Sequence, residues 1–523
     1  MTVSAENLGK LRNIINENLR TQVSNDEVAY VSYGHTLTDV SAKQSHCIFA
    51  RRGCGKTLLL HQSQKQLPSA IKAIYINCED FKHHSFPNVL LQILHNVFTQ
   101  LEGNLSRWFP RQRRLKTIVG ELRTNLDKLK DSADDQNFEI REAVNNGSEV
   151  GSRSGASIST GDGITRASGE LSASRLLKNS VDTEKKYRHN ENKLRELNLR
   201  LPEYKEKIKE FFSLSSGTDA IFIQIDDFYH LNRTDQPYVA DYIHRLCKDT
   251  LLKFKIATLK HNSVLYIERN RQPIGIQERH DYQPINIDFT FEQFDRTRDQ
   301  NRGIFHEYAR RAGLNAAEFD ALFKGQGFDR LILAGGGVPR DCLSFFLEVL
   351  DSVRTDGSDG KIGKDEVRFL SRQTFERRID ELKQDSEGQD QEALLRGIYA
   401  IRAFCLDRKS NVFLVAENEI QKDDDFKTLL YRLMDYRIIH QVAKALTHKS
   451  LTGPNFQAFA IDIGCYAYMR NLQGRFSEID LTQQTAREKM RSAPVLEAKV
   501  FRSFWAGPTG QPIETALVAQ ESE

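Results

Sequence analysis

The residues best suited to chemistry form the segment Ala50-Arg-Arg-Gly-Cys-Gly-Lys-Thr57, which lies between an apolar stretch and a helical one. Gly53 and Gly55 allow the backbone to turn tightly, so that several N–H groups can surround an anion. Lys56, which we expect to be exposed at the loop, supplies a point charge, and Thr57 offers a hydroxyl to Mg²⁺. The segment predicts a phosphate-binding loop formed by Arg52, Gly53, Cys54, Gly55, Lys56, Thr57 and Leu58.

One position departs from the usual pattern of this loop, GxxxxGK[ST], because Ala50 stands where the first glycine is expected. The glycines at 53 and 55 keep the tight part of the turn, so we expect little loss. The alternative is a chance Gly-Lys-Thr sequence at a strand–helix junction.

A second segment, Ala220-Ile-Phe-Ile-Gln-Ile-Asp-Asp227, is an apolar strand that ends in two carboxylates. A buried strand would deliver Asp226 to the water shell of Mg²⁺, while Asp227 could orient or deprotonate an attacking water. Together the two segments have the form of Walker A and Walker B motifs. The alternative for the second is a strand followed by acidic turn residues.

The elements around these motifs alternate between strand and helix, which is typical of an open α/β sheet. Apolar runs predict five strands, and a helix is expected to begin near Lys56. A further amphipathic helix is expected at 4–22. The predicted strands are His46–Ala50, Ala73–Cys78, Ala220–Asp226, Phe254–Leu259 and Ile285–Phe289.

The alternation stops between 105 and 212, which indicates an insert. Its two charged arms, about 112–132 and 175–212, carry apolar residues at helical spacing and could pair as an antiparallel hairpin. Between them, 145–174 is rich in Gly and Ser and is expected to form a flexible tip.

The remaining chain divides by pattern into helical and mixed regions. We expect an N-terminal helix in 1–24, an ATPase-like core in 25–104 and 213–290, and a helical lid in 291–385 that contains the turn Ala334-Gly-Gly-Gly-Val-Pro-Arg-Asp341. Helices followed by two strands, Arg437–Val442 and Phe456–Asp462, outline a winged-helix-like domain in 386–472. The tail, 473–523, shows little pattern, which predicts partial disorder.

The order and spacing of the two motifs resemble an AAA+-type P-loop ATPase of the origin recognition complex branch, which borders on the STAND and KAP groups of NTPases. The resemblance covers about 25–104 and 215–470. It implies ATP and Mg²⁺ as cofactors, with Thr57 and Asp226 near the metal and Asp227 and Lys56 in catalysis. Strong hydrolases of this kind carry Glu where Asp227 stands, so slow turnover suited to a switch is implied.

The same resemblance implies residues that sense the γ-phosphate. A polar residue after the Walker B strand corresponds to Thr258, with Lys260 and Asn262 as alternatives. The lid arginine corresponds to Arg340, whose planar guanidinium could bond a phosphate and report lid closure. The alternative for Arg340 is a solvent-facing residue at a helix start with few packing contacts.

Arginines that could complete a neighbouring subunit's site are Arg269, Arg271 and Arg279, and the sequence does not rank them. Two regions could contact nucleic acid. One is the basic, aromatic segment Arg107–Lys116, which could equally be a solvated elbow around a buried Trp108. The other is the winged-helix-like domain, where the acidic run Asp423–Asp425 argues against DNA and leaves protein docking as an equal alternative.

Composition excludes several classes of protein. The 523 residues include 39% hydrophobic and 28% charged residues, enough for two to four globular domains. A net charge of +3 excludes a histone-like coat, and seven scattered cysteines argue against a disulfide framework or a structural zinc site. His230, His261 and His280 lie near the core motifs without metal-ligand spacing. We find no signal peptide or membrane span in the sequence and expect a cytoplasmic protein.

These observations favour an ATP-dependent switch that controls assembly with DNA or with partner proteins, in a homo-oligomer or with an effector, in a setting such as bacterial mobile elements or antiviral defence. One alternative is a STAND-like signalling ATPase that senses a trigger and recruits an effector without binding DNA itself. Another is a scaffold that binds ATP and barely hydrolyses it.

Overall fold

The computed structural model describes residues 4–19, 30–31, 34–109, 112–130, 192–269, 271–355, 360–386, 388–451, 453–469, 476–505 and 513–520. The expected Gly/Ser tip at 145–174 lies outside these residues, as does the first part of the second insert arm.

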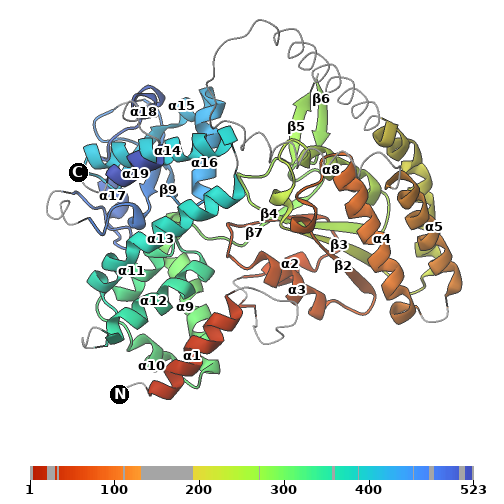
Figure 1. Cartoon of the computed structure of the whole chain (residues 1–523), viewed down its shortest axis with the longest axis horizontal. Coiled ribbons are helices and arrows are strands. Elements are labelled where there is room, and N and C mark those ends of the chain that lie inside the picture. Colours follow the sequence, from red (N-terminus) through yellow and green to blue (C-terminus); the bar gives the residue numbers. More distant parts are fainter. Residues whose placement is uncertain are drawn as a thin grey trace, which may run out of the picture.

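A five-stranded parallel sheet with the order β2-β3-β4-β1-β7 positions both motifs (Figure 1). Side chains on its inner strands are buried on both faces. In β1, Cys47 and Phe49 pack into one apolar cluster, whereas Ile48 packs into another on the opposite face. The strands are β1 (His46–Phe49), β2 (Ile71–Asn77), β3 (Ala220–Asp226), β4 (Leu252–Thr258) and β7 (Gln283–Asn286).

Helices cover both faces of this sheet. On one face lie α2 (Thr36–Val40) and α3 (Lys56–Gln66), where Leu59 and Leu60 enter the cluster of Ile48. On the other lie α4 (Asn88–Trp108) and α8 (Gln236–Cys247). Since β3 is covered on both sides, its sequence is almost continuously apolar rather than alternating.

Two helices extend this second face outward. They are α5 (Arg113–Lys130) and a helix over residues 192–214. Ion pairs Arg114–Glu210 at 2.9 Å and Lys207–Glu121 at 2.8 Å show that the two run antiparallel. The apolar stripe of each helix joins the core cluster of the sheet.

A β-hairpin between β4 and β7 was not expected from the sequence. It consists of β5 (Tyr266–Arg269) and β6 (Gln272–Gly275), which pair antiparallel and project from the sheet (Figure 1). Three of the four residues in β5 are exposed, so the strand has no buried stripe that a sequence pattern could show. The following strand, β7, accordingly lies nearer to the N-terminus than the expected 285–289.

The segment after the sheet is helical, and α1 (Ala5–Asn18) packs against it. Arg12 of α1 pairs with Asp351 at 2.6 Å, and Leu8, Leu11 and Ile15 enter the same apolar cluster. The expected helix at 4–22 thus begins at Ala5, with Ser4 capping it, and ends at Asn18. The helices of this region are α9 (Phe294–Arg311), α10 (Ala316–Asp320), α11 (Gly327–Ala334), α12 (Pro339–Thr355) and α13 (Lys364–Asp385).

The C-terminal region contains a three-stranded antiparallel sheet with the order β8-β10-β9. Two of its strands correspond to the expected pair, and β8 (Val412–Ala416) is additional. The other elements are α14 (Gly388–Asp407), α15 (Glu417–Lys422), α16 (Asp424–Asp435), β9 (Ile439–Leu446) and β10 (Phe456–Ile461).

The described residues of the tail are held by bonds to the domain before it. Backbone bonds join Leu414 of β8 to Pro494 and Leu496, at 2.9 and 2.8 Å, and buried Arg402 donates to the carbonyl of Leu517 at 2.9 Å. Three short helices follow, α17 (Ala486–Met490), α18 (Ala498–Trp505) and α19 (Ile513–Ala519). Helices α18 and α19 pack against α14, whereas α17 lies against β8.

Candidate nucleotide-binding site

The glycine-rich loop leaves the carboxyl end of β1 and enters the N-terminus of α3, whose helix dipole favours an anion. Gly53 and Gly55 have φ values of +86° and +87°, in the left-handed region that other residues adopt at a cost. A Cβ atom at Gly53 would also lie 2.9 Å from Cγ1 of Val338. Both glycines are therefore required by backbone conformation, and Gly53 also by close packing.

Lys56 is buried rather than exposed at the loop, which corrects the expectation from the sequence. Its side chain is 5% exposed, and Nζ donates to the carbonyls of Ala50 at 3.1 Å and Arg51 at 3.3 Å. The ring of Tyr229 lies 5.8 Å from Nζ. In this conformation the ammonium group satisfies carbonyls of its own loop and is already held beside the place where a phosphate would bind.

Asp226 and Thr57, which come from β3 and α3, are in contact. Asp226 accepts hydrogen bonds from Tyr75 Oη at 2.8 Å and from the N–H of Asp227 at 2.9 Å, and the nearby Thr57 hydroxyl stabilises its ionised form. Burial, together with the charge of Asp227, raises the pKa of Asp226 to about 6. A hydroxyl and a carboxylate side by side are oxygen ligands of the kind that Mg²⁺ prefers, so the residues fit the expected metal.

Asp227 has a different environment, although it is the next residue. Its backbone is left-handed, with φ 49° and ψ 40°, and its side chain is only partly buried. This conformation is uncommon for a residue other than glycine and turns the second carboxylate away from the strand. Asp226 is thus the buried carboxylate of the pair, and Asp227 is the more accessible one.

Thr258 lies at the end of β4, between the strands that carry the two motifs. It is fully buried, its carbonyl accepts from the N–H of Ala50 at 3.3 Å, and its hydroxyl lies 2.5 Å from that of Ser263. The two alternatives lie farther along the loop. Lys260 is exposed, and Asn262 bonds Asp435 through its N–H at 2.7 Å and Arg432 through its side chain at 3.0 Å.

The two arginines of the loop have distinct partners. Arg51 is buried and forms a bidentate pair with Asp288, at 2.6 and 2.8 Å, and donates to the carbonyl of Gly336 at 2.8 Å. Arg52 is half-buried and pairs with Asp385 at 2.8 Å and with Glu381 at 3.4 Å, both on α13. Arg51 thus fixes the loop to the sheet edge, whereas Arg52 connects it to a helix far along the chain.

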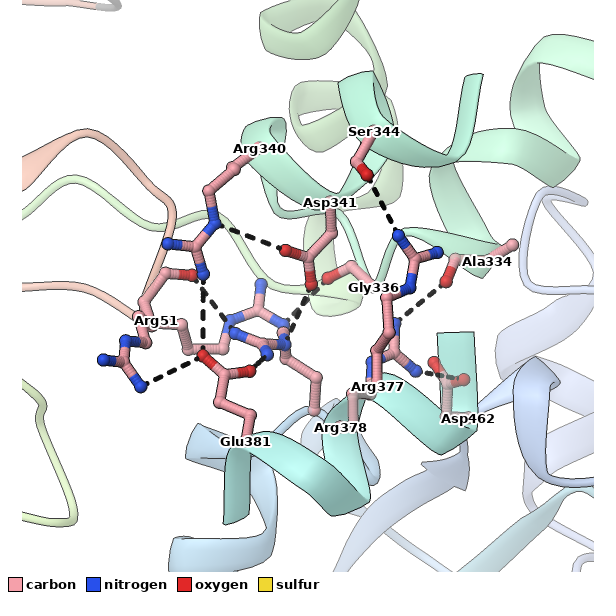
Figure 2. A network of polar contacts seen from close by, with 12 residues as sticks. Arg51, Ala334, Gly336, Arg340, Asp341, Ser344, Arg377, Arg378, Glu381 and Asp462 are labelled. Carbon is pink, nitrogen blue, oxygen red and sulfur yellow. Dashed lines mark hydrogen bonds and ion pairs between the residues drawn. The ribbon is translucent and has the colours of Figure 1, made fainter. Parts of the chain in front are cut away.

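The turn before α12 lies directly on the loop. The N–H of Arg340 donates to the carbonyl of Gly53 at 3.3 Å, and its guanidinium lies 3.5 Å from Glu381 (Figure 2). Gly337 has φ +72°, and a Cβ there would come within 2.6 Å of Thr297 Cγ2. Arg340 therefore does not match the alternative of a weakly packed, solvent-facing residue, because its side chain is 34% exposed and ion-paired.

Arg437, which follows α16, completes the cluster of charges over the loop. It is buried, pairs with Glu381 and with Asp341 at 3.1 Å, and donates to the carbonyl of Arg52 at 3.2 Å. Although burial opposes it, the nearby Arg437, Arg52 and Arg340 lower the pKa of Glu381. The contacts of Glu381, Asp385 and Arg437 with the loop could not be predicted from the sequence. Charged residues on a helix or turn have the pattern of a face exposed to solvent.

The other expected contacts lie away from this loop. Arg269 and Arg271 belong to the β5–β6 hairpin and its turn, and Arg279 is 81% exposed in the next loop. Trp108 packs against the core with Lys72 over its ring, while Arg114 nearby pairs with Glu210. These contacts favour the elbow interpretation of 107–116 over a nucleic-acid surface.

The acidic run before α16 is partly structural, since Asp423 caps the helix by accepting from the N–H of Phe426 at 3.0 Å. Within the part of the chain that the structure describes, His, Cys, Asp and Glu side chains nowhere gather in a group of three that could hold a metal ion. Of the helices among the described residues, none combines the length and apolar character that crossing a membrane requires.

The parallel sheet, the loop between β1 and α3 and the adjacent carboxylate fit an α/β P-loop fold. No family model matches the sequence, and no curated protein matches it. Among solved structures, the chain is similar to a Walker-type ATPase, PABY2304 of Pyrococcus abyssi, with 10% sequence identity, a TM-score of 0.39, and coverage of 86% of this chain and 98% of that one. A structural match this weak does not indicate a function. The functional proposal rests instead on the geometry of the loop.

Proposed function

We propose that the chain is an ATPase that uses Mg²⁺ and acts as a molecular switch. The observation that carries this proposal is the contact of Thr57 with Asp226 beside a glycine-rich loop at the N-terminus of a helix. These groups come from separate elements, and their convergence is what a Mg²⁺–triphosphate requires: backbone N–H donors, a lysine and two oxygen ligands.

The residues have separate roles in this proposal. N–H groups of 52–58 surround the β-phosphate, and Lys56 exchanges its loop carbonyls for phosphate oxygens. Thr57 and Asp226 hold Mg²⁺, which would neutralise charge on the phosphates. Asp227 orients or deprotonates the attacking water, and its short side chain favours slow turnover. Thr258 and Arg340 contact the γ-phosphate.

The charge cluster over the loop supports a switch. Arg52 and Arg340 both pair with carboxylates of α13, and a triphosphate would offer the same guanidinium groups stronger partners. Glu381 and Asp385 would then lose cations and be repelled by the phosphates. Nucleotide binding would thus shift α13 and, through Arg437, the C-terminal region. In the AAA+-type interpretation, 291–385 is the lid and 386–472 the winged-helix-like domain that this exchange moves.

We propose that the resulting movement controls assembly with DNA or a protein partner, in a homo-oligomer or with an effector. The STAND-like alternative has specific support in the same cluster, because a C-terminal residue, Arg437, contacts the loop itself through the carbonyl of Arg52. Such a contact suits a closed state that a trigger must open. ATP-dependent DNA binding favours the first function, and ATP-dependent self-assembly without DNA favours the second.

The experiment that tests the ATPase is titration calorimetry of Mg²⁺–ATP with the wild type and Lys56→Ala. We expect the variant to lose tight binding, because the lysine provides the positive charge closest to the phosphates. Lys65→Ala, at the exposed end of the same helix, is the matched control and should bind as the wild type does.

Since Lys56 also satisfies two loop carbonyls, the melting temperature of each variant is measured in parallel. Lys56→Met, which keeps most of the side-chain length, separates the loss of charge from the loss of packing. Unchanged ATP affinity in a folded Lys56→Met variant would refute the proposed site.

A further inference from the structure

A second cavity, of about 390 Å³, lies on the side of the sheet opposite α3, at the base of the β5–β6 hairpin. Its wall includes Phe49, the last residue of the strand that leads into the phosphate-binding loop. The cavity is within the size range of small-ligand sites. None of the roles proposed above for the nucleotide site uses it.

The walls of this cavity combine aromatic rings with hydrogen-bonding groups. Tyr266 is 39% exposed, and the rings of Phe49 and Tyr282 lie 6.2 Å apart at the back. Gln277 and Glu278 line the same space. An amide and a carboxylate beside an open aromatic ring suit a flat heterocycle that carries an amino group, because the ring can stack and the amino group can donate.

Basic residues lie in the loops that form or flank the cavity. Lys260 lines it and is exposed, and Arg279, which follows Glu278 and lies 3.8 Å from its carboxylate, is 81% exposed. Arg271 lies at the exposed turn of the hairpin above. Cations around an aromatic platform are the arrangement by which proteins hold the phosphates and bases of single strands.

We propose that this cavity binds a nucleobase whose attached phosphate contacts the exposed Lys260, and that a single-stranded nucleic acid supplies it. The base stacks on Tyr266 and donates its amino group to Glu278 or Gln277, while Lys260 contacts the phosphate. A free nucleotide has the same chemistry, so the test below distinguishes the two sources.

The cavity is connected to the ATP site by one loop. Lys260, His261 and Ser263 all line it, and Ser263 lies 2.5 Å from the hydroxyl of Thr258 at the end of β4. The N–H of His261 bonds Asp435 of α16 at 2.9 Å. A base in the cavity would therefore shift a loop that contacts both the γ-phosphate sensor and the C-terminal region. This coupling rests on the proposed ATPase function, whereas base binding does not.

The test measures fluorescence anisotropy of a labelled single-stranded oligodeoxycytidylate of about 12 nucleotides with the full chain, in EDTA and without ATP. We expect salt-dependent binding that Tyr266→Ala weakens roughly tenfold, since stacking of one base accounts for a factor of this size. Phe369→Ala removes an aromatic side chain that is 54% exposed on α13 and should leave the affinity unchanged.

Lys260→Ala keeps the test valid if Tyr266→Ala does not fold, and it should reduce the dependence of affinity on salt. Deoxycytidine 3′-monophosphate is added as a competitor of the bound oligonucleotide. Displacement at millimolar concentration supports the base site and makes a free nucleotide the source, and failure to displace supports a strand as the source.

Equal affinities of Tyr266→Ala and Phe369→Ala, or no binding of either probe to the wild type, would overturn the proposal and leave a protein side chain as the occupant. Adding ATPγS and Mg²⁺ then tests the coupling, which predicts a changed affinity in the wild type. If the chain does not bind ATP, the measurement without nucleotide still decides base binding.

Discussion

Asp226 and Asp227 are neighbours in the sequence, yet the structure gives them opposite environments. Asp226 is fully buried and accepts two hydrogen bonds, whereas Asp227 is partly exposed on a left-handed turn. A buried carboxylate suits a metal ion, and an accessible one suits a water molecule. Because the two environments differ, we expect substitutions of Asp226 and Asp227 to have different effects on ATP binding and turnover.

We expect Asp227→Asn to bind Mg²⁺–ATP with nearly wild-type affinity and to lose most of its turnover, on the order of a hundredfold, because the amide cannot accept a proton from water. Asp226→Asn should weaken the Mg²⁺-dependent part of ATP binding. Calorimetry and phosphate release measure the two effects.

The control is Asp219→Asn, an exposed residue just before the opposite end of the same strand, which pairs with Lys43 at 2.5 Å. It should change neither quantity. Turnover retained in Asp227→Asn would move the catalytic role to another residue.

At the scale of elements, the turn of 335–340 is the part that connects α12 with the phosphate-binding loop. Its contacts are dense, since the backbone of Arg340 bonds Gly53 and the carbonyl of Gly336 accepts from Arg51. The guanidinium of Arg340 pairs with Glu381 at 3.5 Å, a distance that leaves it able to change partner. The turn is thus fixed in its backbone and adjustable in its side chain.

We expect Arg340→Ala to bind ATP and ADP with nearly equal affinity. A charge-assisted bond from the guanidinium to the γ-phosphate, about 1.5–3 kcal/mol, would otherwise favour ATP roughly ten- to a hundredfold. The loss of a half-exposed ion pair should reduce the free energy of unfolding by under about 1 kcal/mol. Calorimetry with each nucleotide and thermal melting measure these effects.

Arg377→Ala is the matched control, because Arg377 pairs with Glu348 at 2.7 Å, between α13 and α12 and without a contact to the loop among its described bonds. It should keep the preference for ATP. If Arg340→Ala also prefers ATP to ADP, the turn serves only as the structural start of α12.

At the scale of the whole molecule, the C-terminal region contacts the core through the end of α16. Asp435 accepts from the N–H groups of His261 and Asn262, and Arg437 reaches the carbonyl of Arg52. Burial raises the pKa of Asp435 to about 6, so the ionised carboxylate is disfavoured in the folded chain. This junction should therefore respond to pH.

The folded state binds the Asp435 proton more tightly than the unfolded state, where the pKa is 3.8. The free energy of unfolding that this tighter proton binding contributes is fully present below about pH 4 and is lost as the pH rises through about 6. Asp435→Asn does not titrate and its amide oxygen can accept the same two bonds.

We therefore expect the stability of Asp435→Asn relative to the wild type to rise between pH 4 and pH 7, by on the order of 1–3 kcal/mol. Urea unfolding of both proteins across this pH range measures the difference. A difference that does not vary with pH would show that Asp435 is not titrating at the junction.

The sequence by itself predicted the α/β class, the strands β1, β2, β3 and β4 to within a few residues, and the placement of the glycine-rich loop at the start of α3. These features depend on local causes: apolar runs that must be buried, and glycines that permit a left-handed turn. Asp226 could be assigned beside Thr57 for the same reason, because parallel strands bring their carboxyl ends to one edge.

Only the tertiary structure decided what surrounds the loop. Glu381 and Asp385 are separated from Arg52 by more than three hundred residues, and Arg437 by more still, yet all three contact it. A charge on a helix has the same sequence pattern whether it meets solvent or an ion of opposite sign. Partners that are brought together by packing alone leave no periodic signal, so neither the charge cluster nor the cavity beside Tyr266 could be derived from the sequence.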